Sequence, residues 1–403
     1  MAGRRQKPTR AKLRAERERA AAQVSVPAVA DVCVIGGGAS GLVAGIVAAE
    51  AGARTVVLER DLECGRTILA TGNGRCNFAN AILEPNRYHG SEFVAAVCGN
   101  DWLEDVLKFF EDCGLAWSEE EGRLYPLSRQ AASVRNVLLE RARRAGVVLA
   151  PAREVTRLDA RADSVSVIWR DRFDAEGTHE IGSEHVILSI GGHGAEVAGL
   201  EGLSMHDPSP VLCPIACDGQ EELLEALDGR RVQCTATLLR GNRRMVTETG
   251  EILFRTYGLS GIAAFNLSRH ARPGDTLSLD LLPSIDEARA RVLAEHTLDG
   301  LLDPVIAEML RVRASLAREA VSIAKHFELN VTGIAQPEKA QVTRGGLVTD
   351  GFDAATLAAV RLPWLHVCGE ALDVDGPCGG YNLAWAWKSG MVAGAAAAKE
   401  ALG

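Results

Sequence analysis

The stretch from Asp31 to Glu59, DVCVIGGGASGLVAGIVAAEAGARTVVLE, constrains the fold of this chain more than any other segment. A short apolar run precedes three glycines spaced Gly-x-Gly-x-x-Gly, an alanine-rich segment of helical character follows, and a second apolar run ends at Glu59. Strand, tight turn, helix, strand and acid in this order are the context in which the glycine pattern marks a dinucleotide-binding unit. The sequence therefore predicts a Rossmann-type α/β fold.

The chemistry of dinucleotide binding explains why glycines and an acid occupy these positions. Gly36 permits the tight turn, Gly38 lets the backbone approach a pyrophosphate, and Gly41 lets helix and strand pack closely. The phosphates are expected at the free N–H groups of the helix that begins near Ala39, and Glu59 is expected to accept hydrogen bonds from ribose hydroxyls. A purely structural glycine turn is the alternative, but it does not explain the second strand and its acid. The predicted contacts here are Gly36, Gly38, Ala39, Ser40, Gly41, Glu59 and Arg60.

Composition narrows the class of protein further. The chain has 403 residues, of which 47% are hydrophobic, and this length predicts two or three domains. Its net charge of −9 argues against a general nucleic-acid binder, and no apolar run approaches the ~18 residues of a membrane span. The ten cysteines are scattered without metal-site spacing, which favours reduced thiols and a cytoplasmic location. We therefore expect a small-molecule partner, no nucleic acid, no membrane and no metal.

Residues 1–28 differ from the rest of the chain. They contain eight Lys or Arg before position 20 and almost no large apolar residues, so they cannot build a core. We interpret them as a disordered or frayed helical basic extension. A weak electrostatic tether to an acidic partner is the functional alternative.

A second glycine-rich segment, GRTILATGNGRCNFAN at 65–80, follows the dinucleotide-binding unit directly. Its backbone N–H groups and two arginines suit a ligand, so we predict that it wraps the cofactor; a solvated surface loop is the alternative. The predicted contacts are Arg66, Gly72, Gly74, Arg75, Cys76 and Asn77. Cys64 and Cys76 are twelve residues apart, which argues against a redox disulfide.

The remaining chain predicts further elements of an α/β protein. Helical periodicity covers 92–113 and 131–145, and each segment ends at a glycine. A strand is expected at 147–149, an antiparallel meander at 154–188, and a last sheet strand at 363–367. Between 206 and 333 the composition changes to a strand-rich part followed by a helical part from 285 to 327, which predicts an inserted domain.

Several motifs occur in the order typical of one family. IGGGASGL, GRTILATGNGRCNFAN and GEALDVDGPCGGYNLAWAWKSG (369–390) together resemble the HI0933-like flavoprotein family, which includes a BaiN-type bile-acid reductase and an aminoacetone oxidase type. The resemblance covers nearly everything from Asp31 to Gly403. It implies FAD, held by a Rossmann-type domain that an inserted β-rich and helical domain interrupts. The expected domains are a first FAD-binding part at 29–205, the insert at 206–333 and a second FAD-binding part at 334–403.

The resemblance also implies cofactor contacts outside the first unit. Glu370 is expected at the ribityl and phosphate groups, and the helix after Gly380 is expected to point its N-terminus at the flavin. By resemblance the contacts include Val155, Gly191, Gly192, Gly369, Glu370, Gly380, Tyr381, Asn382 and Leu383.

Candidate catalytic residues lie in the loops. Arg75, Tyr125 and Tyr257 are the main candidates, with Arg123 and Arg344 also near glycine-rich turns. A Tyr or Arg can protonate a carbon or hold a carbonyl, whereas a packed or phosphate-neutralising side chain is the alternative for each.

Three functions remain open at this stage. The first is an FAD-dependent reductase that moves hydride between NAD(P)H and a small or steroid-like substrate. The second is a flavin-dependent amine oxidase that makes peroxide. The third is a non-catalytic module that holds flavin or associates with RNA. The chain carries no second Gly-x-Gly-x-x-Gly unit in the proper context, so a nicotinamide would bind transiently at the open flavin face, which predicts ping-pong kinetics.

We predict that the purified protein is yellow and that heat releases FAD rather than FMN. Glu59 and the glycine turn are expected to bind the adenosine half of the cofactor, which FMN lacks. Absorbance spectroscopy and chromatography of the released flavin make the measurement. A colourless protein that does not bind added FAD would contradict the prediction.

Overall fold

The computed structural model describes residues 9–192, 197–219 and 221–403. The first eight residues of the basic extension and residues 193–196, after the Gly191-Gly192 pair, lie outside this description. The chain forms two compact units: unit 1 runs to Pro208 and resumes at Arg344, and unit 2 is Ser209–Thr343. Unit 2 extends past the expected limit of 333 because backbone N–H groups of Ala335 and Gln341 still bond to carbonyls of unit 2.

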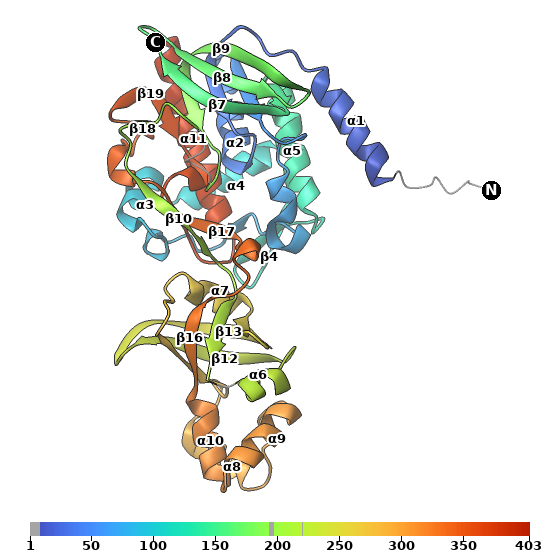
Figure 1. Ribbon diagram of the computed structural model, residues 1–403, viewed down its shortest axis with the longest axis vertical. Helices are drawn as coiled ribbons and strands as arrows, with labels where there is room; N and C mark the ends of the chain where they lie inside the picture. Colours follow the sequence, from blue (N-terminus) through green and yellow to red (C-terminus); the bar gives the residue numbers. More distant parts are fainter. Residues whose placement is uncertain (1–8, 193–196, 220) are drawn as a thin grey trace, which may run out of the picture. The chain divides into compact units, whose positions relative to one another are not determined.

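Unit 1 is built on an eight-stranded sheet with the order β18-β19-β9-β1-β2-β6, extended by β7 and β8 (Figure 1). Strands β19, β9, β1, β2 and β6 pair with one another in parallel, whereas β18 pairs antiparallel with β19. The long strand β9 pairs antiparallel with β8 along its first part and parallel with β1 along its last part, which confirms the predicted meander that returns to the sheet. The strands are β1 (Val29–Ile35), β2 (Thr55–Glu59), β6 (Val148–Pro151), β7 (Arg153–Ala160), β8 (Val165–Asp171), β9 (Asp174–Leu188), β18 (Ala358–Ala359) and β19 (Leu362–Val367).

Helices cover this sheet, and two of them touch backbone to backbone. The apolar helix α11 packs against α2, where an added Cβ at Gly390 or Gly394 would lie within 2.5 Å of a carbonyl oxygen of α2. Only glycine permits this approach. The helices of unit 1 are α1 (Arg10–Ala22), α2 (Ala39–Glu50), α3 (Ser91–Cys98), α4 (Trp102–Asp112), α5 (Ala131–Arg144) and α11 (Tyr381–Leu402).

One helical expectation needs correction. The single helix expected at 92–113 is two helices, because Gly99 and Asp101 adopt positive φ angles of 66° and 57° that end α3 and precede α4. In the basic extension, expected to be disordered or a frayed helix, the residues of α1 form a helix. Thr9 caps it by accepting a hydrogen bond from the Lys12 N–H, and Arg17 pairs with Glu63 at 2.9 Å.

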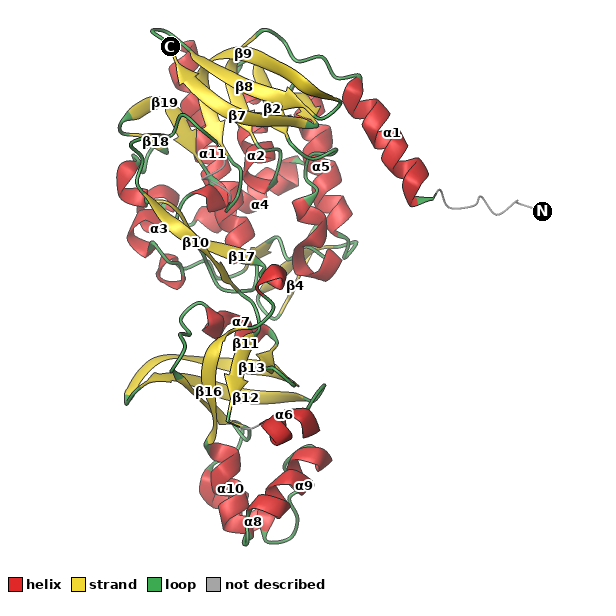
Figure 2. Ribbon diagram, in the orientation of Figure 1, coloured by secondary structure: helices red, strands yellow, loops and turns green. Residues whose placement is uncertain are grey.

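Unit 2 combines a closed antiparallel barrel, in the order β11-β14-β13-β12-β15-β16, with a helical part, as the sequence predicts (Figure 2). Its own hydrophobic core fills the barrel and the space under the helices. The strands are β11 (Ile215–Asp218), β12 (Arg231–Arg240), β13 (Arg243–Arg255), β14 (Gly258–Ser260), β15 (Thr276–Asp280) and β16 (Phe327–Ile334). The helices are α6 (Glu221–Ala226), α7 (Ile262–Ser268), α8 (Glu287–Ala294), α9 (Pro304–Arg313) and α10 (Ala317–Lys325).

Smaller elements complete the structure. A three-stranded sheet joins β3 (Ala79–Asn80), β5 (Arg123–Pro126) and β4 (Trp117–Glu120), and β10 (Met205–Val211) pairs with β17 (Val342–Leu347). Short 3₁₀ turns are η1 (Thr67–Gly74), η2 (Pro85–Arg87), η4 (Pro337–Lys339), η5 (Thr349–Gly351) and η6 (Gly369–Ala371). Within the described ranges, we find no helix that combines the length and the apolar character needed to cross a membrane.

We predict that Gly394→Ala destabilises unit 1 although alanine is the better helix former. The helix propensity favours alanine by about 1 kcal/mol, but the new Cβ would lie 2.4 Å from the Ala44 carbonyl oxygen. Such overpacking costs about 1–3 kcal/mol. The midpoint of urea denaturation should therefore fall.

Gly351→Ala is the matched control, because an added Cβ there meets no atom within 4 Å. Its midpoint should change little. A rise of the midpoint in Gly394→Ala would show that the two helices separate without cost.

Candidate active site and cofactor cradle

The predicted cofactor contacts gather at one edge of the unit 1 sheet. The turns after β1, β2, β9 and β19 carry four groups of them, and these strands are parallel, so their carboxyl ends share that edge. Ligands of open α/β sheets bind at this edge. The contacts by location are Gly36, Gly38, Ala39, Ser40 and Gly41 after β1; Glu59 and Arg60 at the end of β2; Gly191 and Gly192 after β9; and Gly369 and Glu370 after β19.

The three glycines of the first turn have different neighbours. An added Cβ at Gly36 would lie 2.5 Å from the Ser189 carbonyl oxygen, and one at Gly41 would lie 1.9 Å from the Gly36 carbonyl oxygen. Gly38 is different, because the nearest atom to its Cβ position is the Thr67 hydroxyl at 3.7 Å. The fold therefore requires Gly36 and Gly41, whereas the space beside Gly38 is open to a ligand.

Glu59 is fixed against this turn. Its carboxylate accepts hydrogen bonds of 2.7 Å from the N–H groups of both Gly37 and Asp61. Burial raises the pKa of Glu59, while these two hydrogen bonds oppose that rise. The acid is thus oriented by backbone, which leaves its remaining acceptor capacity for hydroxyl groups.

The segment at 65–80 is more ordered than the loop we expected. It contains the 3₁₀ turns of η1, and both Asn73 and Cys76 adopt positive φ angles of 54°. Burial raises the pKa of the Cys76 thiol to about 11, so it stays protonated, and all ten cysteines are free thiols. The Asn77 Oδ1 is buried without a hydrogen-bond partner in the structure, as expected of a group that awaits a donor from a ligand.

The opposite side of the cradle is formed by the turns after β9 and β19. An added Cβ at Gly191 would lie 3.8 Å from the Glu370 carboxylate, and one at Gly369 would lie 2.4 Å from the Ser40 hydroxyl. The first turn, Gly191 and Glu370 therefore lie close together, although they are far apart in the sequence.

Two helices begin at this cradle without a capping side chain. Helix α2 starts after Gly38 and α11 starts after Gly380, and neither has an acidic residue in its first turn. By contrast, α1, α8 and α9 have side-chain caps from Thr or Asp. The positive dipole ends of α2 and α11 are therefore available to phosphate or to developing negative charge.

The loop before α11 is held in place by the first residues of α11 and by side chains that are distant in the sequence. Asn382 accepts a 2.7 Å hydrogen bond from the Gly376 N–H and donates one of 2.8 Å to the Gly376 carbonyl oxygen. The Tyr88 hydroxyl donates to the Tyr381 carbonyl oxygen at 2.8 Å. Position 380 requires glycine, because its φ is 96° and an added Cβ would lie 2.4 Å from the Ala79 carbonyl oxygen. Leu383 follows within the first turn of α11.

A polar network that the sequence analysis did not assign supports the same loop. Asp373 lies 2.7 Å from His206 Nδ1 and 3.3 Å from His89 Nε2, and it accepts a hydrogen bond from the Gly345 N–H at 2.9 Å. Burial opposes its ionisation, but the hydrogen bonds from His89 and His206 outweigh burial and hold the pKa of Asp373 below its ordinary value. The DVDG sequence at 373–376, separated from Glu370 by two residues, was the available signal for it.

Arg344 belongs to this network rather than to an open substrate loop. Its guanidinium group makes two hydrogen bonds, of 2.7 and 2.9 Å, to the fully buried carboxylate of Asp375. Such bidentate pairs are geometrically specific. We therefore assign Arg344 a positioning role.

The catalytic candidates divide between the two units. Arg75 lies over the ring of Tyr125 at 5.1 Å, and Arg129 lies over the same ring at 4.7 Å, so the structure brings Arg75 and Tyr125 together. Tyr125 is almost fully buried, whereas Arg75 is exposed. Tyr257 lies in unit 2.

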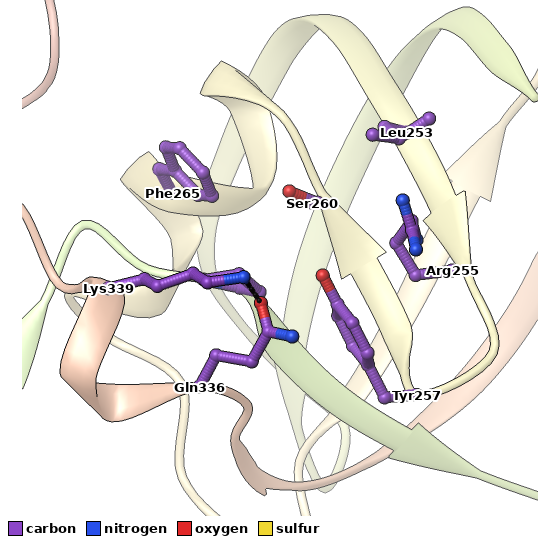
Figure 3. Close-up of a pocket in the computed structure, with 8 residues that line it drawn as sticks. Leu253, Arg255, Tyr257, Ser260, Phe265, Gln336 and Lys339 are labelled. Carbon is purple, nitrogen blue, oxygen red and sulfur yellow. Dashed lines mark hydrogen bonds between the residues drawn. The ribbon is translucent and has the colours of Figure 1, made fainter. Parts of the chain in front are cut away.

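Tyr257 lines a pocket of about 240 Å³ that lies entirely within unit 2 (Figure 3). Arg255, Ser260, Gln336 and Lys339 give it a polar wall, and Gln336 accepts a 3.1 Å hydrogen bond from Lys339. Arg255 lies 5.9 Å from the Tyr257 ring centroid. Phenol, hydroxyl, amide and cationic groups of this kind suit a polar or anionic ligand.

The other predicted contacts lie on several elements of unit 1. Arg60 and Arg66 are exposed, and Arg66 pairs with Asp61 at 2.6 Å. Val155 is a buried residue of β7 that pairs with Trp169. Gly72 and Gly74 lie in η1.

The groups that line the cradle fit flavin adenine dinucleotide (FAD). It offers an open glycine turn, two uncapped helix N-termini, an oriented acid and the unpartnered Asn77 amide oxygen. The fold and this site define a Rossmann-type FAD-dependent oxidoreductase.

The comparisons with known proteins identify the family. The model of the HI0933-like protein Rossmann domain matches residues 30–396, and the chain belongs to this family. It is 32% identical over 412 residues to a 3-dehydro-bile acid delta(4,6)-reductase of Clostridium scindens, covering 91% of this chain and 98% of that protein. It is 27% identical over 395 residues to a ribosomal RNA dihydrouridine synthase of Escherichia coli, covering 89% and 96%.

Among solved structures, the open conformation of a flavocytochrome c3 fumarate reductase matches with a TM-score of 0.51 and 16% identity. The match covers 97% of this chain and 81% of that chain. It shows a shared fold.

We predict that Gly38→Val abolishes FAD binding but leaves the fold intact. A Cβ at this position meets no atom closer than the Thr67 hydroxyl at 3.7 Å, but the side chain occupies the space through which a pyrophosphate approaches the backbone. We expect the dissociation constant of FAD to rise at least about 100-fold, which equals about 2.7 kcal/mol. Flavin fluorescence titration measures the affinity, and circular dichroism checks the fold.

Gly41→Val is the contrasting variant, because its Cβ would collide with the Gly36 carbonyl oxygen at 1.9 Å. It should fail to fold. Normal FAD affinity in folded Gly38→Val would show that the cofactor does not pass this turn.

Proposed function

We propose that this protein is an NAD(P)H-linked FAD reductase that adds hydride to a carbon–carbon double bond conjugated with a carbonyl group in a small or steroid-like substrate. The observation that carries the proposal is the similarity to two relatives with different named substrates. The names of both describe reduction of such a bond, in a bile acid and in uridine. The bond type is therefore the common element, and the bile-acid reductase is the more similar of these two.

Bound FAD would supply the hydride chemistry, and the protein residues would hold and polarise the substrate. Arg75 is the group that we assign to the substrate carbonyl, because it is exposed, carries a guanidinium group and lies in the segment that we predict to wrap the cofactor. Hydrogen bonds from a guanidinium to a conjugated carbonyl oxygen draw electrons from the distal carbon, which makes that carbon the hydride acceptor. Tyr125 lies under Arg75 and is a positioning residue in this scheme.

The nicotinamide would bind only transiently. All strand pairings in the described barrel of unit 2 are antiparallel, so those residues contain no second βαβ unit of the dinucleotide-binding type. The reductant and the substrate would then use the same flavin face in turn. This arrangement leads to ping-pong kinetics.

We predict that NADH or NADPH bleaches the flavin band under anaerobic conditions and that a conjugated enone restores it. Stopped-flow absorbance measures both half-reactions separately. Arg75→Met should slow the second half-reaction by about 10²–10³-fold, the typical loss for one oxyanion-type donor, and leave the first nearly unchanged.

Arg129→Met is the matched control. Its guanidinium group also lies over the Tyr125 ring but pairs with Glu120 at 2.7 Å, so its loss should leave both half-reactions near normal. The proposal would be wrong if neither NADH nor NADPH bleached the flavin band and the protein formed peroxide from an amine in air. That result would favour the amine oxidase function.

A second candidate substrate is uridine in RNA. The similarity to the ribosomal RNA dihydrouridine synthase covers 89% of this chain, and eight Lys or Arg residues precede position 20. Phosphate contacts made by such a segment weaken as salt rises. Salt-sensitive RNA binding that is lost on deletion of residues 1–28, with dihydrouridine formed in the bound RNA, would favour this substrate over a free enone.

A further inference from the structure

Three side chains with metal-ligating atoms meet in unit 1, away from the cofactor cradle. His185 lies on β9, His366 lies on β19, and Glu400 lies in the last turn of α11. Figure 1 shows the C-terminal end of α11 beside these strands. His185 precedes the end of β9 by three residues, which is about 10 Å along a strand. The cluster is therefore separated from the turn after β9 that carries Gly191.

The distances within the cluster match a tetrahedral metal site. His366 Nε2 lies 3.3 Å from His185 Nδ1 and 3.4 Å from Glu400 Oε2, and His185 Nδ1 lies 3.6 Å from Glu400 Oε2. For bonds of about 2.0–2.2 Å, tetrahedral geometry separates neighbouring ligand atoms by about 3.3–3.6 Å. All three separations lie in that range, so one ion can reach all three atoms with little rearrangement.

Hydrogen bonding orients the ligands in the way that a metal requires. His366 is fully buried, and its Nδ1 lies 2.9 Å from the Thr356 carbonyl oxygen, which can only accept a proton. In the neutral ring this contact places the lone pair on Nε2, toward His185 and Glu400. A carbonyl that fixes the ligating nitrogen from the far side of the ring is a recurring feature of metal sites.

The cluster contains more hydrogen-bond acceptors than donors. With His366 Nε2 as an acceptor, the cluster contains two acceptors, this nitrogen and the Glu400 carboxylate, and a single donor, His185 Nδ1–H. The charged group beside the cluster on β9 is Glu184, which is exposed and adjacent to His185.

We propose that His185, His366 and Glu400 bind a divalent transition metal, Zn²⁺ in particular, at a site separate from the flavin cradle. Two imidazole nitrogens and one carboxylate oxygen are ligands typical of Zn²⁺, and a water molecule would complete the tetrahedron. The ligands come from three elements, so the ion would join the end of α11 to two central strands. An ion that binds only the folded chain stabilises it by mass action.

The test uses the FAD-loaded protein, dialysed against a chelator and then titrated with Zn²⁺ by calorimetry. We expect one Zn²⁺ per chain and a higher unfolding temperature in its presence. Co²⁺ should give the visible bands of four-coordinate cobalt at wavelengths beyond the flavin bands. Glu400→Gln and His185→Gln should each weaken Zn²⁺ binding by at least about 10–100-fold, the loss known for groups that merely support a ligand.

Glu184→Gln is the matched control, because it removes a carboxylate next to His185 but outside the cluster. It should bind Zn²⁺ like the unchanged protein. An unaltered flavin spectrum in each variant shows that the fold is kept. Absence of Zn²⁺ binding in the unchanged protein, or equal binding in Glu400→Gln and the unchanged protein, would overturn the proposal.

Discussion

The structure of unit 1 depends on direct contact between backbone groups at its centre. The turn after β1 approaches both α2 and Ser189, which follows β9, and the helix α11 approaches α2, at positions where a single methyl group has no room. Added Cβ atoms at Gly36, Gly41 and Gly390 would lie 2.5, 1.9 and 2.5 Å from carbonyl oxygens. Because backbone atoms cannot move aside as a flexible side chain can, these contacts fix the relative positions of four elements. The N-terminus of α2 is fixed with them.

The same contacts determine where a cofactor can bind. They place the turns after β1, β9 and β19 next to each other, and they bring the uncapped start of α2 to the same edge as Glu370. Trp385 and Ser389 of α11 extend this arrangement, because Trp385 Nε1 donates to the Gly369 carbonyl oxygen and the Gly369 N–H donates to the Ser389 hydroxyl. The rigid elements thus hold the binding groups, and the variable loops are left for substrate recognition.

The sequence predicted those parts of the site that are local in the chain. The turn at Gly36–Gly41, its acid Glu59 and the meander before β9 each follow from spacing and periodicity within a few dozen residues. The network at Asp373 could not be found in this way, since His206 and His89 are 167 and 284 residues away from it. No periodicity connects such positions, and only the folded chain brings them together. The break at Gly99–Asp101 was visible as a glycine signal, but the long apolar periodicity around it masked the break.

The loop between Glu370 and Gly380 shows why polar residues, rather than apolar ones, control the start of α11. It contains Asp373 and Asp375, both buried, and burial of a carboxylate is costly unless partners stabilise the charge. Those partners are Arg344 for Asp375 and the pair of histidines for Asp373. Apolar side chains would tolerate several packings of this loop, whereas directional hydrogen bonds to two fixed carboxylates allow few. The loop therefore presents the N-terminus of α11, with its positive dipole end, in one orientation.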